Sequence, residues 1–177
     1  NCCSFKPHSS INNVFMEFNK TADGKYEKLP KPNVDTGMGL ERTTVVMQSK
    51  STVFDTDIFE DILLFIKNNS TKFEDRASRI VADHIRSAVM IISDGVSPSN
   101  TEAGYVLRRI LRRAIRYIDQ LGVSKEKITD LAEIVIKKSG DVYPNLGTRK
   151  SEILSIIKNE DEKFRKTLSE GLKQFEK

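Results

Sequence analysis

The sequence predicts an α+β protein that is predominantly α-helical, with a partial antiparallel sheet at its start and a helical bundle after it. Residues 11–19 alternate in the manner of a strand, and a turn signal follows at 22–25. From residue 51 onward, apolar residues recur at the spacing of amphipathic helices. We therefore expect a sheet-containing part at 1–50 and a helical part at 51–177.

The strand expected at 11–19 has apolar residues on both faces. Val14 lies on one face and Phe15 on the other, so we expect this strand to lie well inside a sheet. The preceding residues, 1–10, show no periodicity and are expected to form a loop with His8 in solvent.

A hairpin is expected to follow the first strand. The turn at 22–25 leads into a returning strand at 26–29. Because proline has no N–H to donate to a neighbouring strand, Pro30 and Pro32 are expected to end it. A further short strand at 33–36 is expected to lead into a turn that contains glycine.

That turn belongs to an octet at 35–42, Asp-Thr-Gly-Met-Gly-Leu-Glu-Arg. Gly37 and Gly39 permit a positive φ or a close approach to a ligand. Asp35 can oppose a cation, while Arg42 and the start of the following helix favour an anion. These features fit a ligand with an amine-like and a phosphate-like group, and they also fit a plain turn before a surface helix.

The helical part opens with a cap signal at Asp55 or Thr56, and its first helix is expected to stop at the Asn-Asn-Ser run of 68–70. Several later helices are expected to stop at glycine, and Asn100 or Thr101 is expected to cap one of them. A helix is also expected directly after the octet, at 40–48. The remaining helices are expected at 73–93, 104–121, 128–139 and 149–177.

The helix expected at 104–121 carries arginines in one arc of about 140°, opposite an apolar face. One interpretation is a solvated face with salt bridges to acidic residues of neighbouring helices. The other is a ridge that contacts the phosphates of a nucleic acid. Binding to a membrane surface is disfavoured, because the sequence has no Trp for the interface. The arginines are Arg108, Arg109, Arg112, Arg113 and Arg116.

The composition allows a polyanionic partner without requiring one, since the formal net charge is +4. No run of eighteen apolar residues predicts a membrane span. The two cysteines, Cys2 and Cys3, are adjacent, so a disulfide between them would be strained and a zinc site is improbable. Free thiols and the lack of a signal-peptide pattern favour a cytoplasmic protein with no bound metal.

The octet resembles the third signature motif of class II aminoacyl-tRNA synthetases, in the form typical of the alanyl-tRNA synthetase family. The resemblance extends from about residue 11 to the end of the chain. It implies the end of a class II catalytic domain at 1–50 and a helical tRNA-recognition domain at 51–177. Further segments that resemble the family are 13–19, 29–34, 54–57, 82–86, 94–100 and 104–109.

The family activates alanine with ATP and magnesium and then transfers it to tRNA(Ala). By resemblance, Asp35 would hold the α-amino group of alanine, and Gly37 and Gly39 would line the pocket for alanine and its adenylate. Arg42 would bind the ATP triphosphate, and Asn12 matches an asparagine near the amino-acid pocket.

The family identifies its tRNA largely by a G·U wobble pair in the acceptor stem. Asn100 matches an asparagine implicated in that recognition, and an amide suits the edge of such a pair because it holds a donor and an acceptor. The arginine ridge would contact backbone phosphates. His84 is interpreted either as a structural histidine or as a tRNA contact.

The chain also departs from the family pattern. Ile11 stands where the family usually has tryptophan, and the first two motifs and the zinc-binding editing domain of the family have no counterpart in the sequence. We therefore expect a fragment of an alanine–tRNA ligase that is inactive alone. The alternative is a non-catalytic helical RNA-binding module that keeps the octet only for structure.

Overall fold

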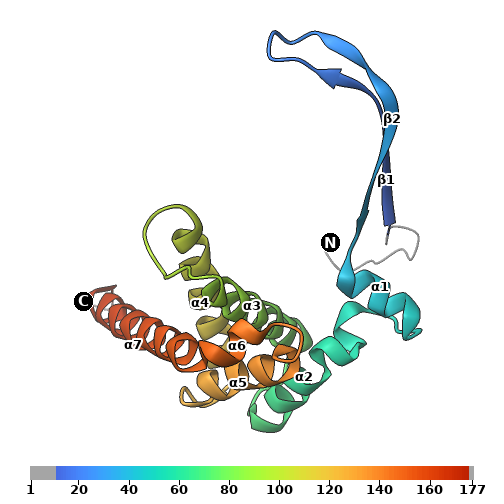
Figure 1. Ribbon diagram of the computed structural model, residues 1–177. Coiled ribbons are helices and arrows are strands. Elements are labelled where there is room, and N and C mark those ends of the chain that lie inside the picture. The colour runs from blue at the N-terminus through green and yellow to red at the C-terminus, as the bar shows by residue number, and fades with distance from the viewer. Residues whose placement is uncertain (1–10, 176–177) are drawn as a thin grey trace. The chain divides into compact units, whose positions relative to one another are not determined.

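The structure is a computed structural model that describes residues 11–175 (Figure 1). The chain divides into two compact units, residues 1–58 and residues 59–177. The first unit holds a two-stranded antiparallel sheet, and the second holds most of the helices. The prediction of a predominantly helical α+β protein is confirmed. Both cysteines and His8, about which predictions were made, lie outside the described residues.

The sheet is a hairpin of β1, Ile11–Lys20, and β2, Tyr26–Met38 (Figure 1). The backbone N–H of Thr21 donates to the carbonyl oxygen of Lys25 at 2.9 Å and closes the turn. Gly24 has a φ of +84°, in the left-handed region that favours glycine. The predicted turn is therefore confirmed.

The prediction that the prolines end the second strand is wrong, because β2 runs through both Pro30 and Pro32. The pairing of the two strands is interrupted where residues 29–32 lie opposite Glu17 alone. Both prolines fall in this bulge, where their missing N–H removes no hydrogen bond from the ladder. The two short strands predicted on either side of the prolines are one strand.

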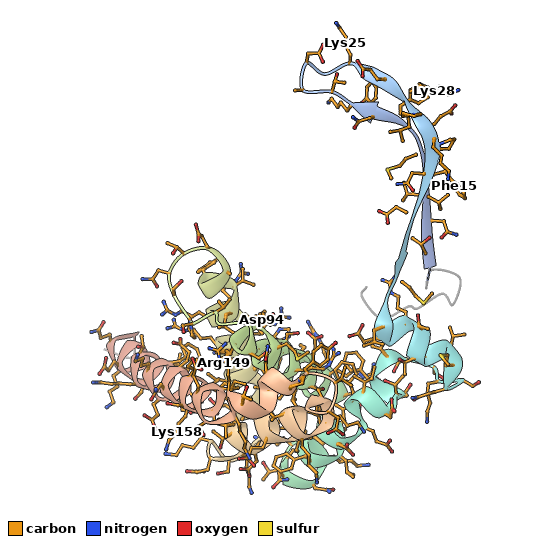
Figure 2. The ribbon with its side chains drawn as sticks, in the orientation of Figure 1. Phe15, Lys25, Lys28, Asp94, Arg149 and Lys158 are labelled. Atoms are coloured by element: carbon orange, nitrogen blue, oxygen red, sulfur yellow. The ribbon has the colours of Figure 1, made fainter. Side chains whose placement is uncertain are left out.

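The first strand was also expected to lie inside a sheet, and in the described structure it does not. The described residues form a sheet of two strands, so both strands are edges. Phe15 is 79% exposed and projects from the hairpin, as Figure 2 shows, and Val14 and Val34 are exposed as well. The apolar residues on both faces of β1 identify a strand suited to burial, but the described residues do not cover it.

The predicted helices are present, with ends within a few residues of those expected. Two short helical segments were not predicted, the 3₁₀ helix at Val53–Asp55 and the helix at Pro144–Thr148. Residues 144–148 were expected to form a connector, and they form a short helix with Pro144 in its first turn and Leu146 buried. The helices are α1 Leu40–Met47, the 3₁₀ helix η2 Val53–Asp55, α2 Asp57–Asn69, α3 Asp75–Ser93, α4 Glu102–Gln120, α5 Lys127–Ser139, α6 Pro144–Thr148 and α7 Lys150–Phe175.

The helical unit is organised around one apolar core. Helix α3 packs along α4, and α7 packs against both α4 and α5. Ile85 of α3, Leu111 of α4 and Ile153 of α7 are fully buried, as the apolar stripes of their helices predict. Between residues 11 and 175, none of the helices combines the length and the apolar character that crossing a bilayer requires.

Candidate nucleic-acid interface and the glycine octet

The octet does not form the predicted turn. Strand β2 continues through Gly37, which pairs with Asn12 of β1, and α1 begins directly after Gly39. Gly39 has a φ of −77° and a ψ of 123°, a conformation open to any residue. The backbone conformation therefore does not explain why glycine occupies either position. The two glycines differ in their surroundings. A Cβ on Gly37 would meet nothing within 4 Å, while one on Gly39 would contact the Arg42 side chain at 3.5 Å.

Of the three charged residues of the octet, Asp35 and Arg42 lie on separate elements. Asp35 is on β2 opposite Val14, and Arg42 is in the first turn of α1. Both side chains are exposed. The same turn of α1 carries Glu41, whose carboxylate complements the positive end of the helix dipole. The octet thus presents a carboxylate and a guanidinium to solvent on either side of two glycines.

In the helical unit, three arginines of α4 point into solvent. Arg109, Arg113 and Arg116 are exposed, and no described residue forms an ion pair with any of them. The guanidinium of Arg109 lies 5.7 Å from the ring centre of Tyr105, and that of Arg113 lies 5.9 Å from that of Tyr117. Such stacking on a neighbouring ring restrains a guanidinium without neutralising it. These three arginines, the exposed arginine face, form a positive surface along α4.

The other two arginines of the arc pair with a carboxylate of α7. Arg112 donates from Nε to Oε1 of Glu160 at 2.8 Å, and Nε of Arg108 lies 3.5 Å from the same oxygen. Glu160 is buried, with 4% of its surface exposed. The guanidinium of Arg112 also lies over the ring of Phe164, at 5.2 Å. The arc predicted as one surface is therefore divided, and the salt-bridge interpretation describes Arg108 and Arg112.

Arg108 also holds the loop that precedes α4. Its Nη2 donates to the carbonyl oxygen of Pro98 at 3.1 Å, and its Nη1 donates to Oδ1 of Asn100. The N–H of Ser99 donates to the carbonyl oxygen of Gly104 at 3.0 Å, which closes the loop on the first turn of the helix. A Cβ on Gly104 would lie 2.5 Å from the carbonyl oxygen of Ser97, so this close approach requires glycine. Asn100 is thus fixed beside the start of α4.

Glu102, at the first position of α4, has a φ of +50°, which is strained for a residue with a Cβ. We expect Glu102→Gly to raise the free energy of unfolding by about 1 kcal/mol, because glycine adopts this φ without strain. Chemical denaturation measures the change. Glu102→Ala is the matched control, since it removes the same carboxylate and keeps the strain. If both variants have the same stability, the backbone at this position is not strained.

His84 was interpreted either as a structural histidine or as a tRNA contact, and in the structure it has a local partner. Nδ1 of His84 lies 2.9 Å from Oδ2 of Asp83, and the imidazole is 17% exposed. The partner comes from the same helix, so the contact gives the ring a fixed orientation. It identifies no ligand.

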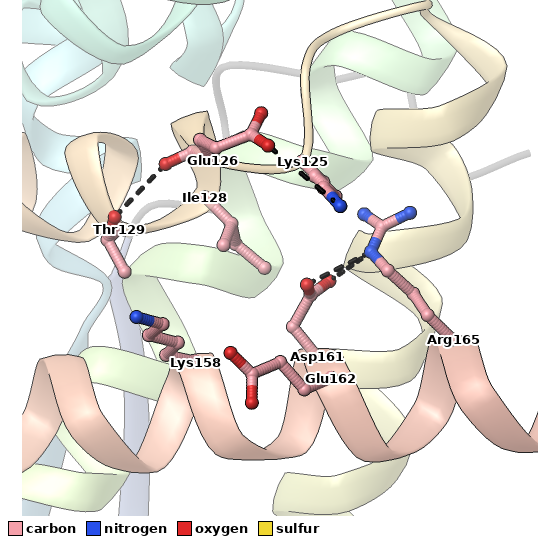
Figure 3. A pocket seen from close by; sticks show the side chains of 8 residues that line it. All are labelled: Lys125, Glu126, Ile128, Thr129, Lys158, Asp161, Glu162 and Arg165. Atoms are coloured by element: carbon pink, nitrogen blue, oxygen red, sulfur yellow. Dashed lines mark hydrogen bonds and ion pairs between the residues drawn. The ribbon is translucent and has the colours of Figure 1, made fainter.

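A cavity of about 540 Å³ lies where the start of α5 meets α7 (Figure 3). Two of its charged residues pair with each other, since Nε of Arg165 donates to both carboxylate oxygens of Asp161, at 2.8 and 3.0 Å. Burial raises the pKa of Asp161, although Arg165 opposes the shift. The cavity has as many acidic as basic residues, so it does not favour a charged ligand of either sign. Its lining residues are Lys125, Glu126, Ile128, Thr129, Lys158, Asp161, Glu162 and Arg165.

Sequence analysis missed Glu160 and the role of Gly104. Glu160 did leave a signal, because it falls on the apolar stripe of its helix, three residues after Ile157 and four before Phe164. A carboxylate on an apolar stripe predicts a buried ion pair with another helix. Gly104 left a weaker signal, as a glycine within the first turn of a helix.

The family model described as tRNA synthetases class II (A) matches residues 7–177. The chain is 46% identical over 167 residues to an alanine–tRNA ligase of Bacillus pumilus, a match that covers 91% of this chain and 19% of the relative. An alanine–tRNA ligase of Acetivibrio thermocellus matches with the same identity and coverage. That of Bacillus subtilis is 44% identical over 167 residues, again with 91% and 19% coverage. The chain therefore spans about a fifth of the length of these relatives.

Proposed function

Because the chain belongs to the class II family of alanyl-tRNA synthetases, we propose that it forms part of an alanine–tRNA ligase. Such an enzyme activates alanine with ATP and transfers it to tRNA(Ala). Within it, the helical unit binds the acceptor stem and the octet contributes to the pocket for alanine and ATP. The exposed arginine face of α4, next to the loop that holds Asn100, is the observation that carries this proposal.

The exposed arginine face and the loop that holds Asn100 would contact different parts of the RNA. Arg109, Arg113 and Arg116 have no described ionic partner, so their charge is available to backbone phosphates, which position an RNA without reading its sequence. Asn100 lies at the start of the same helix and supplies an amide for the edge of a base pair. This spacing along one helix suits an RNA duplex whose phosphates contact the exposed arginine face while one of its base pairs contacts Asn100.

The octet suits the amino-acid and nucleotide side of the reaction. Asp35 would bind the α-amino group of alanine, and the open space above Gly37 leaves room for the substrate. Gly39 and the asparagine at position 12 would complete this side of the pocket. Arg42, at the start of α1, would bind the triphosphate of ATP.

The described part of the chain holds no cluster of side chains that would bind a metal ion by itself. Between residues 11 and 175, no three His, Cys, Asp or Glu side chains gather closely enough to hold one. The proposed roles concern only direct contacts with alanine, ATP and RNA, because magnesium that accompanies ATP is held largely by phosphates and water.

The proposal is tested by binding of the 177-residue chain to acceptor-stem duplexes. We expect the chain to bind a duplex with a G·U pair about fivefold more tightly than one with G·C, because one base-edge hydrogen bond distinguishes them. Asn100→Ala is expected to remove most of this difference. Fluorescence anisotropy with labelled duplexes measures both affinities.

The control variant is Asn159→Ala, which removes an exposed amide of α7 and should preserve the preference. Equal affinity of the wild-type chain for the two duplexes would contradict sequence-specific recognition by this chain. A preference that persists in Asn100→Ala would assign the recognition to another residue.

A further inference from the structure

A chain of contacts connects the buried core of the helical unit to Asn100. It starts at the Glu160 carboxylate on α7, which is 4% exposed. Arg108 lies next in the chain, with Nε 3.5 Å from Oε1 of Glu160. The two terminal nitrogens of Arg108 then donate to Pro98 and to Asn100. One guanidinium therefore joins a buried carboxylate to the exposed loop.

We propose that Glu160, acting through Arg108, positions the loop of residues 98–100 and fixes Asn100 with its amino group facing outward as a hydrogen-bond donor. The inference rests on the proposed function and deepens it. It adds a positioning residue, and it states which partner donates the hydrogen bond between Asn100 and the base pair. It assigns an acceptor atom of the base pair as the partner of Asn100.

The direction follows from the donor chemistry of arginine. A guanidinium has five N–H donors and no acceptor, so the atom of Asn100 that it contacts must be the carbonyl oxygen Oδ1. This contact removes the usual ambiguity in the orientation of an asparagine amide. The oxygen is occupied, and the Nδ2 amino group remains for a ligand.

Glu160 is the anchor because Arg108 has no other described acid partner. Nε of Arg108 is buried and makes no described hydrogen bond, so the negative charge at 3.5 Å is what favours the guanidinium in this position. Without that charge, the guanidinium gains more by turning to water than by staying against the core. The loop would then lose both contacts with Arg108 at once.

The positioning role has a test that needs no RNA. The N–H of Ser99 is bonded to Gly104 only while the loop is closed, so its hydrogen exchange reports loop order. We expect Glu160→Gln to accelerate this exchange at least about tenfold. The matched control, Glu162→Gln, removes an exposed carboxylate two residues away on the same helix and should leave the exchange unchanged. Unchanged exchange in a folded Glu160→Gln protein overturns the positioning role.

Arg108→Lys provides a second variant in case Glu160→Gln does not fold, as judged by circular dichroism. Lysine keeps the positive charge beside Glu160 but cannot bond Glu160, Pro98 and Asn100 together, because it has no planar fork. The same acceleration at Ser99 is expected. Wild-type exchange in Arg108→Lys overturns the role of the fork.

Asn100→Asp tests the outward donor. Aspartate keeps the oxygen that Arg108 bonds, so exchange at Ser99 should stay slow, while the outward amino group becomes an acceptor. We expect the roughly fivefold preference for the G·U duplex to disappear in this variant and to fall in Glu160→Gln. A preserved preference in Asn100→Asp overturns the donor assignment.

The two proposals fail in different ways. If the wild-type chain has no preference for G·U, the proposed recognition fails and the donor assignment fails with it, while the exchange at Ser99 still decides whether Glu160 positions the loop. If the wild type has the preference and Glu160→Gln keeps it with a disordered loop, the recognition stands and Glu160 still positions the loop, but the inference that this positioning serves the recognition is overturned.

Discussion

Replacing Arg109, Arg113 and Arg116 together with glutamine should lower the affinity of the chain for an acceptor-stem duplex about 100-fold at low salt. Each of these guanidinium groups is exposed and has no described acid partner, so each can neutralise one phosphate and release its counterions. The slope of log affinity against log salt should fall by about three, or one for each lost contact. Titrations at several salt concentrations measure both changes.

The control for this triple variant must change the net charge equally. Lys67, Lys137 and Lys138 lie on α2 and α5, away from α4 in sequence, and their replacement by glutamine removes the same charge. If the binding surface is the arginine face, this control should reduce the slope much less. Equal losses in the two variants would mean that overall charge, with no particular surface, attracts the RNA.

The division of the arginine arc shows what helical periodicity can and cannot predict. The sequence places all five arginines on one side of α4, because their spacing alone fixes their angles about the helix axis. It does not say which edge of that arc another helix covers. Helix α7 covers one edge and brings Glu160, 48 residues away in sequence, to Arg112. That contact depends on tertiary packing, which local spacing does not contain.

The hairpin illustrates a second limit. Strand and turn were predictable from alternation and from the glycine-containing turn at 22–25. The path through Pro30 and Pro32 was not, because a proline stops a strand only where its N–H is needed by a neighbour. In the structure the register shift places both prolines opposite Glu17, where the ladder is already interrupted. Register is a property of the strand pair and cannot be read from one strand.

The octet illustrates the opposite case, where the residues were informative and the predicted conformation was wrong. A positive φ was one of the two physical reasons offered for the glycines, beside a close approach to a ligand, and neither glycine has it. The remaining reason is the space above Gly37, which a side chain would occupy. A glycine that is needed for a ligand can have an ordinary backbone, so its role becomes visible only through the chemistry of its neighbours.

That reasoning makes Asp35 the decisive residue of the octet. In the full-length ligase proposed above, Asp35→Ala should lower alanine-dependent pyrophosphate exchange about 100-fold or more, because a carboxylate paired with an ammonium group is a charge-assisted contact. Asp35→Asn keeps the shape and one acceptor but removes the charge, so its activity should fall between that of the wild type and that of Asp35→Ala. The duplex affinity of both variants should equal that of the wild type, since the proposed RNA surface belongs to α4. If Asp35→Ala activates alanine normally, the octet is a scaffold and the chain is better described as an RNA-binding module.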